Sequence, residues 1–266
     1  SRTGKSQPFF LYFPLTSPHY PVVPTANFKG KSGAGDYGDF VMQSDATVGA
    51  LMEALAKHGL AKNTLVIFTS DNGPEVASEV AIGAYDRIQR YGHFSMERWR
   101  GVKRDSREGG HRVPFVARWP GRIPAGRVSD ELFGQVDLMA TIAGIIGYRL
   151  PAGAAPDSVD QLAVWRGKKS SQPIRGELVY HQSNGHLALR QGNWVLIDSA
   201  TCGDGNKEPE WFREKRKAED CRLPGALYNL RDDPGQTRNL YGKYPERVQE
   251  LKARLEQLRQ SEAVSK

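Results

Sequence analysis

One apolar run that ends in two polar side chains constrains the fold of this chain most. The segment Thr64-Leu-Val-Ile-Phe-Thr-Ser-Asp-Asn-Gly-Pro74 carries no charge before Asp71, which is typical of a strand buried on both faces of a parallel sheet. In open α/β sheets, ligands bind just beyond the carboxyl ends of the strands, so Asp71 and Asn72 lie where a site is expected. Their oxygen atoms suit Ca²⁺ or Mg²⁺ rather than zinc or copper. The same residues also form ordinary polar turns, so this run alone leaves both interpretations open.

The segments around this run predict an α/β architecture. Residues 8–13 are apolar and predict a first buried strand, and residues 39–58 carry apolar side chains at helical spacing. A strand, a helix and a second strand in this order predict parallel pairing. Residues 72–112 then form a long excursion dense in Gly, Arg and Tyr. Such a segment is unusual inside a compact domain unless it has a function.

A second, smaller domain is expected after this sheet. The first part ends with a strand over 113–119 and an apolar helix over 137–146, and residues 147–173 are rich in Gly, Ala, Pro and Ser. Short strands are then expected at 177–181, 186–190, 194–198 and 226–230, before a terminal helix with Val248, Leu251, Leu255 and Leu258 on one stripe. We therefore expect an α/β sheet with flanking helices over residues 1–168 and a small α+β domain over residues 172–266.

Composition excludes some classes of protein and leaves others open. No run approaches the ~18 apolar residues that span a bilayer, so no membrane segment is expected. The net charge of +7 favours anionic partners, but no nucleic-acid-binding motif accompanies it. Cys202 and Cys221 are compatible with one disulfide, which would indicate an oxidising compartment, and also with free thiols. Because the chain starts at Ser1 and enters an apolar run almost at once, we expect an upstream part of a longer protein. The sequence carries no signal for an oligomeric state.

Two basic side chains complete a candidate site. His19 follows the first predicted strand, and Lys103 lies in the long excursion before the third. If the sheet is parallel, the first two strand ends share one edge and the excursion can fold over both. His19 would then donate a proton or a hydrogen bond, and Lys103 would supply a fixed positive charge. Taken singly, His19 is also typical of a loop residue and Lys103 of a solvated one.

The chain resembles the type I, formylglycine-dependent sulfatases of the alkaline phosphatase superfamily. The resemblance covers the chain from end to end and depends on several short motifs in family order, of which each alone is weak. They are Pro-Phe-Phe-Leu-Tyr-Phe13 with Pro18-His-Tyr-Pro21, Thr69-Ser-Asp-Asn-Gly-Pro74, Arg100-Gly-Val-Lys103, Glu108-Gly-Gly-His-Arg-Val-Pro114, Arg118-Trp-Pro-Gly121 and Leu227-Tyr-Asn-Leu-Arg-Asp-Asp-Pro234.

This resemblance implies a role for each candidate residue. Asp71 and Asn72 would bind Ca²⁺, in preference to Mg²⁺, and Lys103 would hold a sulfate oxygen. His19 would contact the ester near its leaving oxygen, and His93 in the long excursion could approach the substrate. The family hydrolyses sulfate esters by attack of a hydrated formylglycine on sulfur. By the same resemblance, the parent protein is expected in the periplasm or secreted, and its partner is a small-molecule or carbohydrate sulfate ester.

The departures from the family pattern concern the nucleophile. Neither the Cys/Ser-x-Pro-x-Arg motif that carries formylglycine nor the upstream Asp-Asp pair of the metal site occurs here. The chain therefore resembles the C-terminal half to two-thirds of a sulfatase, and the formylglycine is expected in the missing N-terminal part. We predict that these 266 residues alone lack appreciable sulfatase activity. A phosphoester or phosphonate hydrolase of the same superfamily, and a non-catalytic module that binds sulfated glycans, remain alternatives, and the physiological ester stays open.

Overall fold

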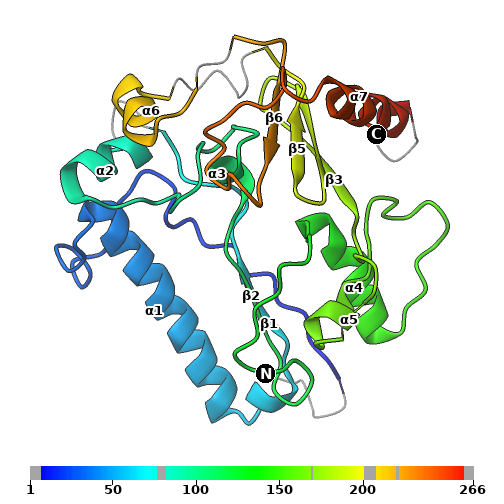
Figure 1. Ribbon diagram of the computed structural model, residues 1–266. Coiled ribbons are helices and arrows are strands. Elements are labelled where there is room, and N and C mark those ends of the chain that lie inside the picture. The colour runs from blue at the N-terminus through cyan, green and yellow to red at the C-terminus, as the bar shows by residue number, and fades with distance from the viewer. Residues whose placement is uncertain (1–6, 77–81, 169, 201–207, 220–221, 261–266) are drawn as a thin grey trace.

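The protein is a mixed α/β structure in which two small sheets lie between peripheral helices (Figure 1). The computed structural model describes residues 7–76, 82–168, 170–200, 208–219 and 222–260. The predicted cysteine pair, Cys202 and Cys221, lies outside these residues. Among the described residues, no helix combines the length and the apolar character that a membrane span requires.

The first part of the chain contains one long helix and one short sheet. Its elements are α1 (Gly35–Lys57), η1 (Ala61–Asn63), β1 (Val66–Thr69), α2 (Ala84–Tyr91), α3 (Glu108–His111), β2 (Phe115–Arg118), η2 (Gln135–Asp137), α4 (Leu138–Ile146) and α5 (Leu162–Trp165). The helices expected at 39–58 and 137–146 and the strands expected near 65–68 and 113–119 are thus present, with shifted ends. In Figure 1, α1 lies along one side of the molecule, and β1 and β2 run through its middle.

The predicted parallel sheet is not what the described residues form. β1 pairs with β2 in an antiparallel register that joins Val66 to Arg118 and Thr69 to Phe115. The buried strand expected at residues 8–13 is also wrong, because these residues pair with no strand of the described chain and their side chains are exposed, Phe10 by 81%. A strand needs a neighbour for its backbone N–H and C=O groups, and β1 finds that neighbour in β2.

The second part confirms the predicted antiparallel sheet and terminal helix. β3 (Glu177–His181), β4 (Leu187–Gln191), β5 (Trp194–Ile197) and β6 (Ala226–Asn229) pair in sequence order, and all three pairings are antiparallel. The turn between β4 and β5 contains Gly192 at φ +58°, a value that glycine adopts without strain. The short α6 (Glu210–Arg216) interrupts the path from β5 to β6, and α7 (Pro245–Gln260) closes the chain.

The core of this sheet is buried on both faces. Leu189, Leu196 and Leu227 lie opposite one another across three strands and pack against α7 through a row of its apolar side chains, Val248, Leu251 and Leu255. Their neighbours along the strands point to the opposite face, where Ala188, Val195, Ile197, Ala226 and Tyr228 form a second cluster. Alternation along a strand places consecutive side chains on opposite faces, so α7 covers one face and the remainder of the molecule covers the other.

Ion pairs cross the expected domain boundary. Arg175, just before β3, donates through Nε to the buried carboxylate of Asp137 at 2.9 Å. Arg190 of β4 approaches Glu108 of α3 at 3.4 Å. The division into residues 1–168 and 172–266 stays a prediction, and these contacts show that its two halves touch.

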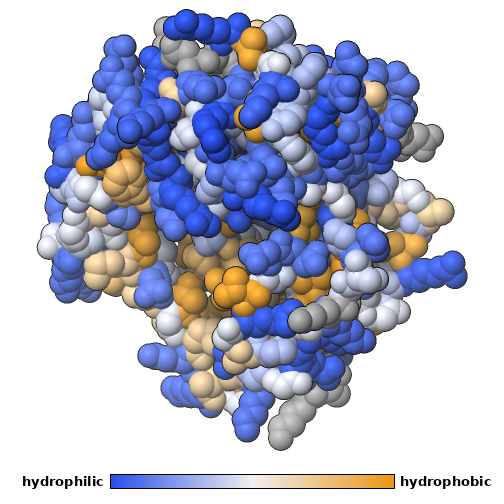
Figure 2. Space-filling model, viewed as in Figure 1, coloured by the Kyte–Doolittle hydropathy of each residue, from blue (hydrophilic) through white to orange (hydrophobic). Residues whose placement is uncertain are grey.

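Apolar surface crosses the middle of the molecule. Figure 2 shows it at the level of β1 and β2, below a mostly polar upper part. Exposed hydrophobic side chains of this part of the chain include Phe9, Phe13, Phe68 and Val116. The short sheet therefore leaves much of its own apolar surface uncovered among the described residues.

Candidate active site

The structure brings His19 and Lys103 together from positions 84 residues apart in the sequence. Lys103 Nζ lies 3.3 Å from His19 Nε2. The loop that carries His19 is held by a hydrogen bond from the His19 backbone N–H to the Thr16 carbonyl at 3.0 Å and by contact of Ser17 Oγ with Ser44 Oγ on α1 at 2.7 Å. The predicted convergence of these two side chains is therefore present, although the parallel sheet that was expected to produce it is not.

The other ring nitrogen of His19 fixes its tautomer. His19 Nδ1 lies 2.7 Å from the carbonyl oxygen of Tyr20. A carbonyl oxygen only accepts hydrogen bonds, so Nδ1 carries the proton in this contact. We infer that Nε2 presents its lone pair to the Lys103 ammonium, which has only donors to offer. Where the two side chains meet, Lys103 thus donates a hydrogen bond and His19 Nε2 accepts it.

A carboxylate that the sequence reasoning missed also contacts Lys103. Glu75 Oε2 lies 3.5 Å from Lys103 Nζ. Arg104 donates to both oxygens of the same carboxylate, through Nη1 at 3.1 Å and through Nη2 in a shorter contact. Glu75 comes three residues after Asn72 at the end of β1, and its charge beside a basic excursion is the one signal in the sequence that could have identified it.

The environment of Glu75 keeps it ionised. Partial burial raises the pKa of this carboxyl. The hydrogen bonds from Arg104 and from the Val76 backbone, with the charges of Arg104 and Lys103, outweigh burial and hold the pKa below its ordinary value. The group formed by Glu75, Lys103 and Arg104 therefore carries one net positive charge.

Glycines allow the two strand-end loops to touch. Gly73 donates its backbone N–H to the Gly110 carbonyl at 2.8 Å, and a methyl group on Gly73 would come 1.9 Å from the Gly109 carbonyl oxygen. A side chain at Gly73 would therefore push the two loops apart. Next to this contact, the Lys103 backbone N–H donates to the Pro74 carbonyl at 2.8 Å. These bonds join the Asp71-Asn72 loop directly to the Lys103 loop.

Asp71 and Asn72 supply part of a hard-cation site. Asp71 is exposed and accepts from the Asn72 backbone N–H at 2.9 Å, while the Asn72 side-chain amide donates to the Gly73 carbonyl at 2.9 Å. That orientation commits the amide nitrogen and leaves the amide oxygen as the donor that a cation would use. In the described part of the chain, no three His, Cys, Asp or Glu side chains gather as a metal site. Because Ca²⁺ takes about 6–8 oxygens, these two residues fit a fraction of its shell.

The loop between β6 and α7 holds the segment that carries Lys103. Arg100 donates to the Gln236 carbonyl at 2.9 Å, and the Glu108 backbone N–H donates to the Gln236 side-chain oxygen at 2.8 Å. Arg100 also forms a buried ion pair with Glu208 at 2.7 Å. One residue of the C-terminal part thus holds both ends of the segment that carries Lys103, and no local sequence pattern indicated this.

His93 lies beside the long helix α1. Its ring packs near Tyr37 of α1 at a centroid distance of 6.1 Å. Burial, with the nearby charge of Arg87, lowers the pKa of His93. Its predicted contact with substrate stays a prediction.

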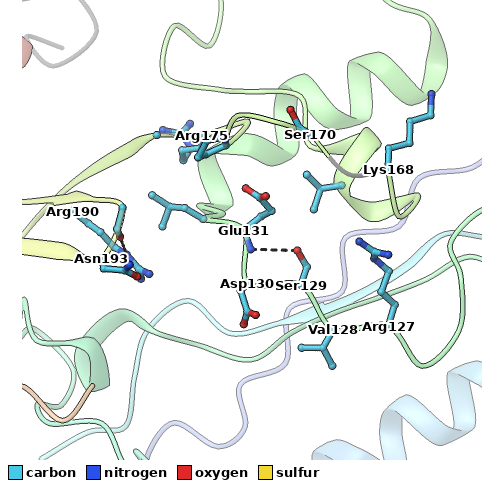
Figure 3. Close-up of a pocket in the computed structure, with 15 residues that line it drawn as sticks. Arg127, Val128, Ser129, Asp130, Glu131, Lys168, Ser170, Arg175, Arg190 and Asn193 are labelled. Carbon is cyan, nitrogen blue, oxygen red and sulfur yellow. Dashed lines mark hydrogen bonds between the residues drawn. The ribbon is translucent and has the colours of Figure 1, made fainter. Parts of the chain in front are cut away.

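A cavity of about 500 Å³ lies elsewhere, between the loop after β2 and the small sheet. Figure 3 shows Arg127, Lys168 and Arg175 around it together with the carboxylates Asp130 and Glu131. Because Arg175 is paired with Asp137 and acidic side chains accompany the remaining cations, the lining favours neither sign of charge. His19, Asp71, Asn72, His93 and Lys103, all described by the structure, lie outside this lining.

The chain is similar in sequence to sulfatases over most of its length. The family model for sulfatases matches residues 2–148. The chain is 36% identical over 255 residues to an N-acetylgalactosamine-6-O-sulfatase of Bacteroides thetaiotaomicron, covering 96% of this chain and 48% of the relative. It is 34% identical over 258 residues to arylsulfatase A of Homo sapiens, covering 93% and 48%.

A solved structure shares the fold over nearly the same extent. It comes from a study of glycosaminoglycan metabolism by Bacteroides thetaiotaomicron and superposes with a TM-score of 0.79 and 32% identity, covering 96% of this chain and 51% of that chain. The chain spans about half the length of the curated relatives it matches, 48% in both cases.

Proposed function

Because the chain belongs to the sulfatase family, we propose that the protein of which it forms part hydrolyses sulfate monoesters. The observation that supports this most is the contact of Lys103 Nζ with His19 Nε2 at 3.3 Å, since it brings a cation and a ring nitrogen that can take up a proton to one point. The two loops that hold Asp71-Asn72 and Lys103 are bonded to each other beside that point.

The proposed chemistry follows from the charge that the reaction moves. A sulfate monoester gathers negative charge on its leaving oxygen in the transition state, so groups that stabilise that charge accelerate the reaction selectively. Lys103 would hold a sulfate oxygen through its ammonium. His19, with Nδ1 committed to the Tyr20 carbonyl, would serve the leaving oxygen through Nε2. Because Nε2 presents a lone pair to Lys103 in this contact, it must first take up a proton before it can donate to that oxygen.

Two groups outside this chain complete the proposal. Asp71 and Asn72 would hold Ca²⁺ through side-chain oxygens, and the ion would supply positive charge beside the sulfate. A formylglycine in the remaining part of the protein would supply the nucleophile. The chain alone, without that nucleophile, is proposed to be inactive.

The proposed substrate is a small-molecule or carbohydrate sulfate ester. The relative from Bacteroides thetaiotaomicron is named for a sulfated amino sugar, and the net charge of +7 favours an anionic substrate. A periplasmic or secreted location is part of the same proposal, as expected for an enzyme that meets such esters outside the cytoplasm.

A paired assay tests this function. The whole protein, carrying its matured nucleophile, is assayed with 4-nitrophenyl sulfate and 4-nitrophenyl phosphate, with Ca²⁺ and after chelation. We expect preferential turnover of the sulfate, lost on chelation and restored by Ca²⁺. Preferential turnover of the phosphate would replace the proposal with a phosphoester hydrolase, and binding of sulfated glycans without turnover would replace it with a binding module.

A further inference from the structure

Lys103 is held by a second charged side chain besides its contact with His19. The carboxylate of Glu75 lies 3.5 Å from its ammonium, and the side chains of both residues are about one-fifth exposed, 21% for Lys103 and 18% for Glu75. A lysine side chain has several rotatable bonds, so an ammonium with no fixed partner would sample many positions. The carboxylate therefore restricts where that ammonium can lie.

Glu75 is itself held by hydrogen bonds to both its backbone and its side chain. The Glu75 carbonyl accepts from the Ala84 backbone N–H at the start of α2 at 2.9 Å, and Glu75 Oε1 accepts from the Val76 backbone N–H at 2.8 Å. The neighbouring Pro74 carbonyl accepts from Lys103 itself. Glu75 thus reaches Lys103 from a loop that is already bonded to the Lys103 backbone.

Arg104 binds the Glu75 carboxylate from an unfavourable backbone conformation. It adopts φ +77°, which is unfavourable for a residue with a side chain, and it binds both Glu75 oxygens. Such conformations persist where surrounding contacts over-determine them, and they gather at functional sites. Arg104 also balances the charge of Glu75, so that the carboxylate orients Lys103 without cancelling the positive charge at the site.

We propose that Glu75 is a positioning residue of the reaction, which fixes the Lys103 ammonium beside His19 while Arg104 balances its charge. This inference rests on the proposed function, because it assigns Glu75 a part in the chemistry of Lys103. It does not place Glu75 in contact with the substrate.

The test is a double-mutant cycle in the whole protein. Glu75→Gln keeps the size of the side chain and removes its charge, and Glu53→Gln on the exposed face of α1 is the matched control. We expect Glu75→Gln to lower kcat for 4-nitrophenyl sulfate by about 10- to 100-fold, since small misplacements of a reacting group cost that much. In a Lys103→Ala background, the same substitution should cost less than about twofold, because residues that act through one another are not additive.

Each result decides the inference. Equal losses of kcat in both backgrounds would show that Glu75 stabilises the fold rather than the position of Lys103, and no loss of kcat in the wild-type background would remove Glu75 from the reaction.

Lysine acetylation followed by mass spectrometry tests Glu75 independently of turnover. Glu75→Gln should increase the labelling of Lys103 relative to exposed Lys62, and unchanged labelling would overturn the inference. If the wild-type protein shows no turnover, the proposed function is contradicted instead. The labelling experiment still tests whether Glu75 restricts Lys103, because it does not depend on turnover.

Discussion

Replacing Lys103 by alanine should remove a large part of the transition-state stabilisation. Lys103 Nζ lies 3.3 Å from the ring nitrogen that is proposed to serve the leaving oxygen. We take the separation of the ammonium from the developing charge as about 4 Å. Two unit charges at that distance interact by about 4 kcal/mol at an effective dielectric constant near 20. Because each ~1.4 kcal/mol is tenfold in rate, this energy sets an upper limit near 10³-fold.

The expected loss is smaller than that limit. Glu75 lies 3.5 Å from the same ammonium and offsets part of its field, and loss of one donor to an oxyanion typically costs about 10²–10³ in kcat. We therefore expect Lys103→Ala in the whole protein to lower kcat for an aryl sulfate by about 10²-fold or more. Steady-state kinetics with 4-nitrophenyl sulfate measure it, with exposed Lys57→Ala on α1 as the control. A rate within about threefold of wild type would remove Lys103 from the mechanism.

Three further predictions concern stability and the limits of this chain. Leu251→Ala removes a fully buried side chain between α7 and the sheet, and it should lower the free energy of unfolding by about 2–5 kcal/mol, measured by denaturant titration; a loss below about 1 kcal/mol would contradict the packing. Glu177 accepts hydrogen bonds from Arg254, which lower its pKa although burial opposes this. The folded pKa lies below the unfolded value, so the pair stabilises the protein above about pH 4.5 and loses that contribution as the pH falls through the folded pKa. The melting temperature of Glu177→Gln should therefore fall less on acidification than that of wild type, and equal slopes would contradict this. The 266 residues alone should show no turnover of an aryl sulfate, and measured turnover would place a nucleophile within them.

Local sequence signals predicted the second part of the fold well. The strand expected at 177–181 forms as Glu177–His181, and the strand expected at 194–198 forms as Trp194–Ile197. The stripe of α7 also packs as its spacing indicated. Strand length, turn residues and helical period are encoded within a few neighbouring residues, so they can be read from the sequence before any contact is known.

Pairing between distant strands could not be predicted in the same way. The apolar run at residues 8–13 looks like a buried strand, yet it has no partner in the described chain, and β1 pairs with β2 across 45 or more intervening residues. An apolar pattern says that a segment needs a neighbour and does not say which neighbour it has. The expected parallel sheet was wrong for this reason.

The sequence predicted two side chains of the candidate site that touch, and it missed two residues that hold them in place. Resemblance and strand-end placement indicated His19 and Lys103, which touch. Glu75 was missed because its role depends on the side-chain geometry of two loops, which glycines bring within backbone contact. Gln236 was missed because it acts from the other end of the chain.

A crystal structure of the whole protein with Ca²⁺ and a slowly hydrolysed sulfate ester would test the convergence of these loops most directly. The account predicts the ester sulfate within hydrogen-bond distance of Lys103 Nζ, its bridging oxygen beside His19 Nε2, and the metal on the side-chain oxygens of Asp71 and Asn72. An ester bound away from these four side chains, or side chains at 19, 71 and 103 directed to separate surfaces, would contradict it.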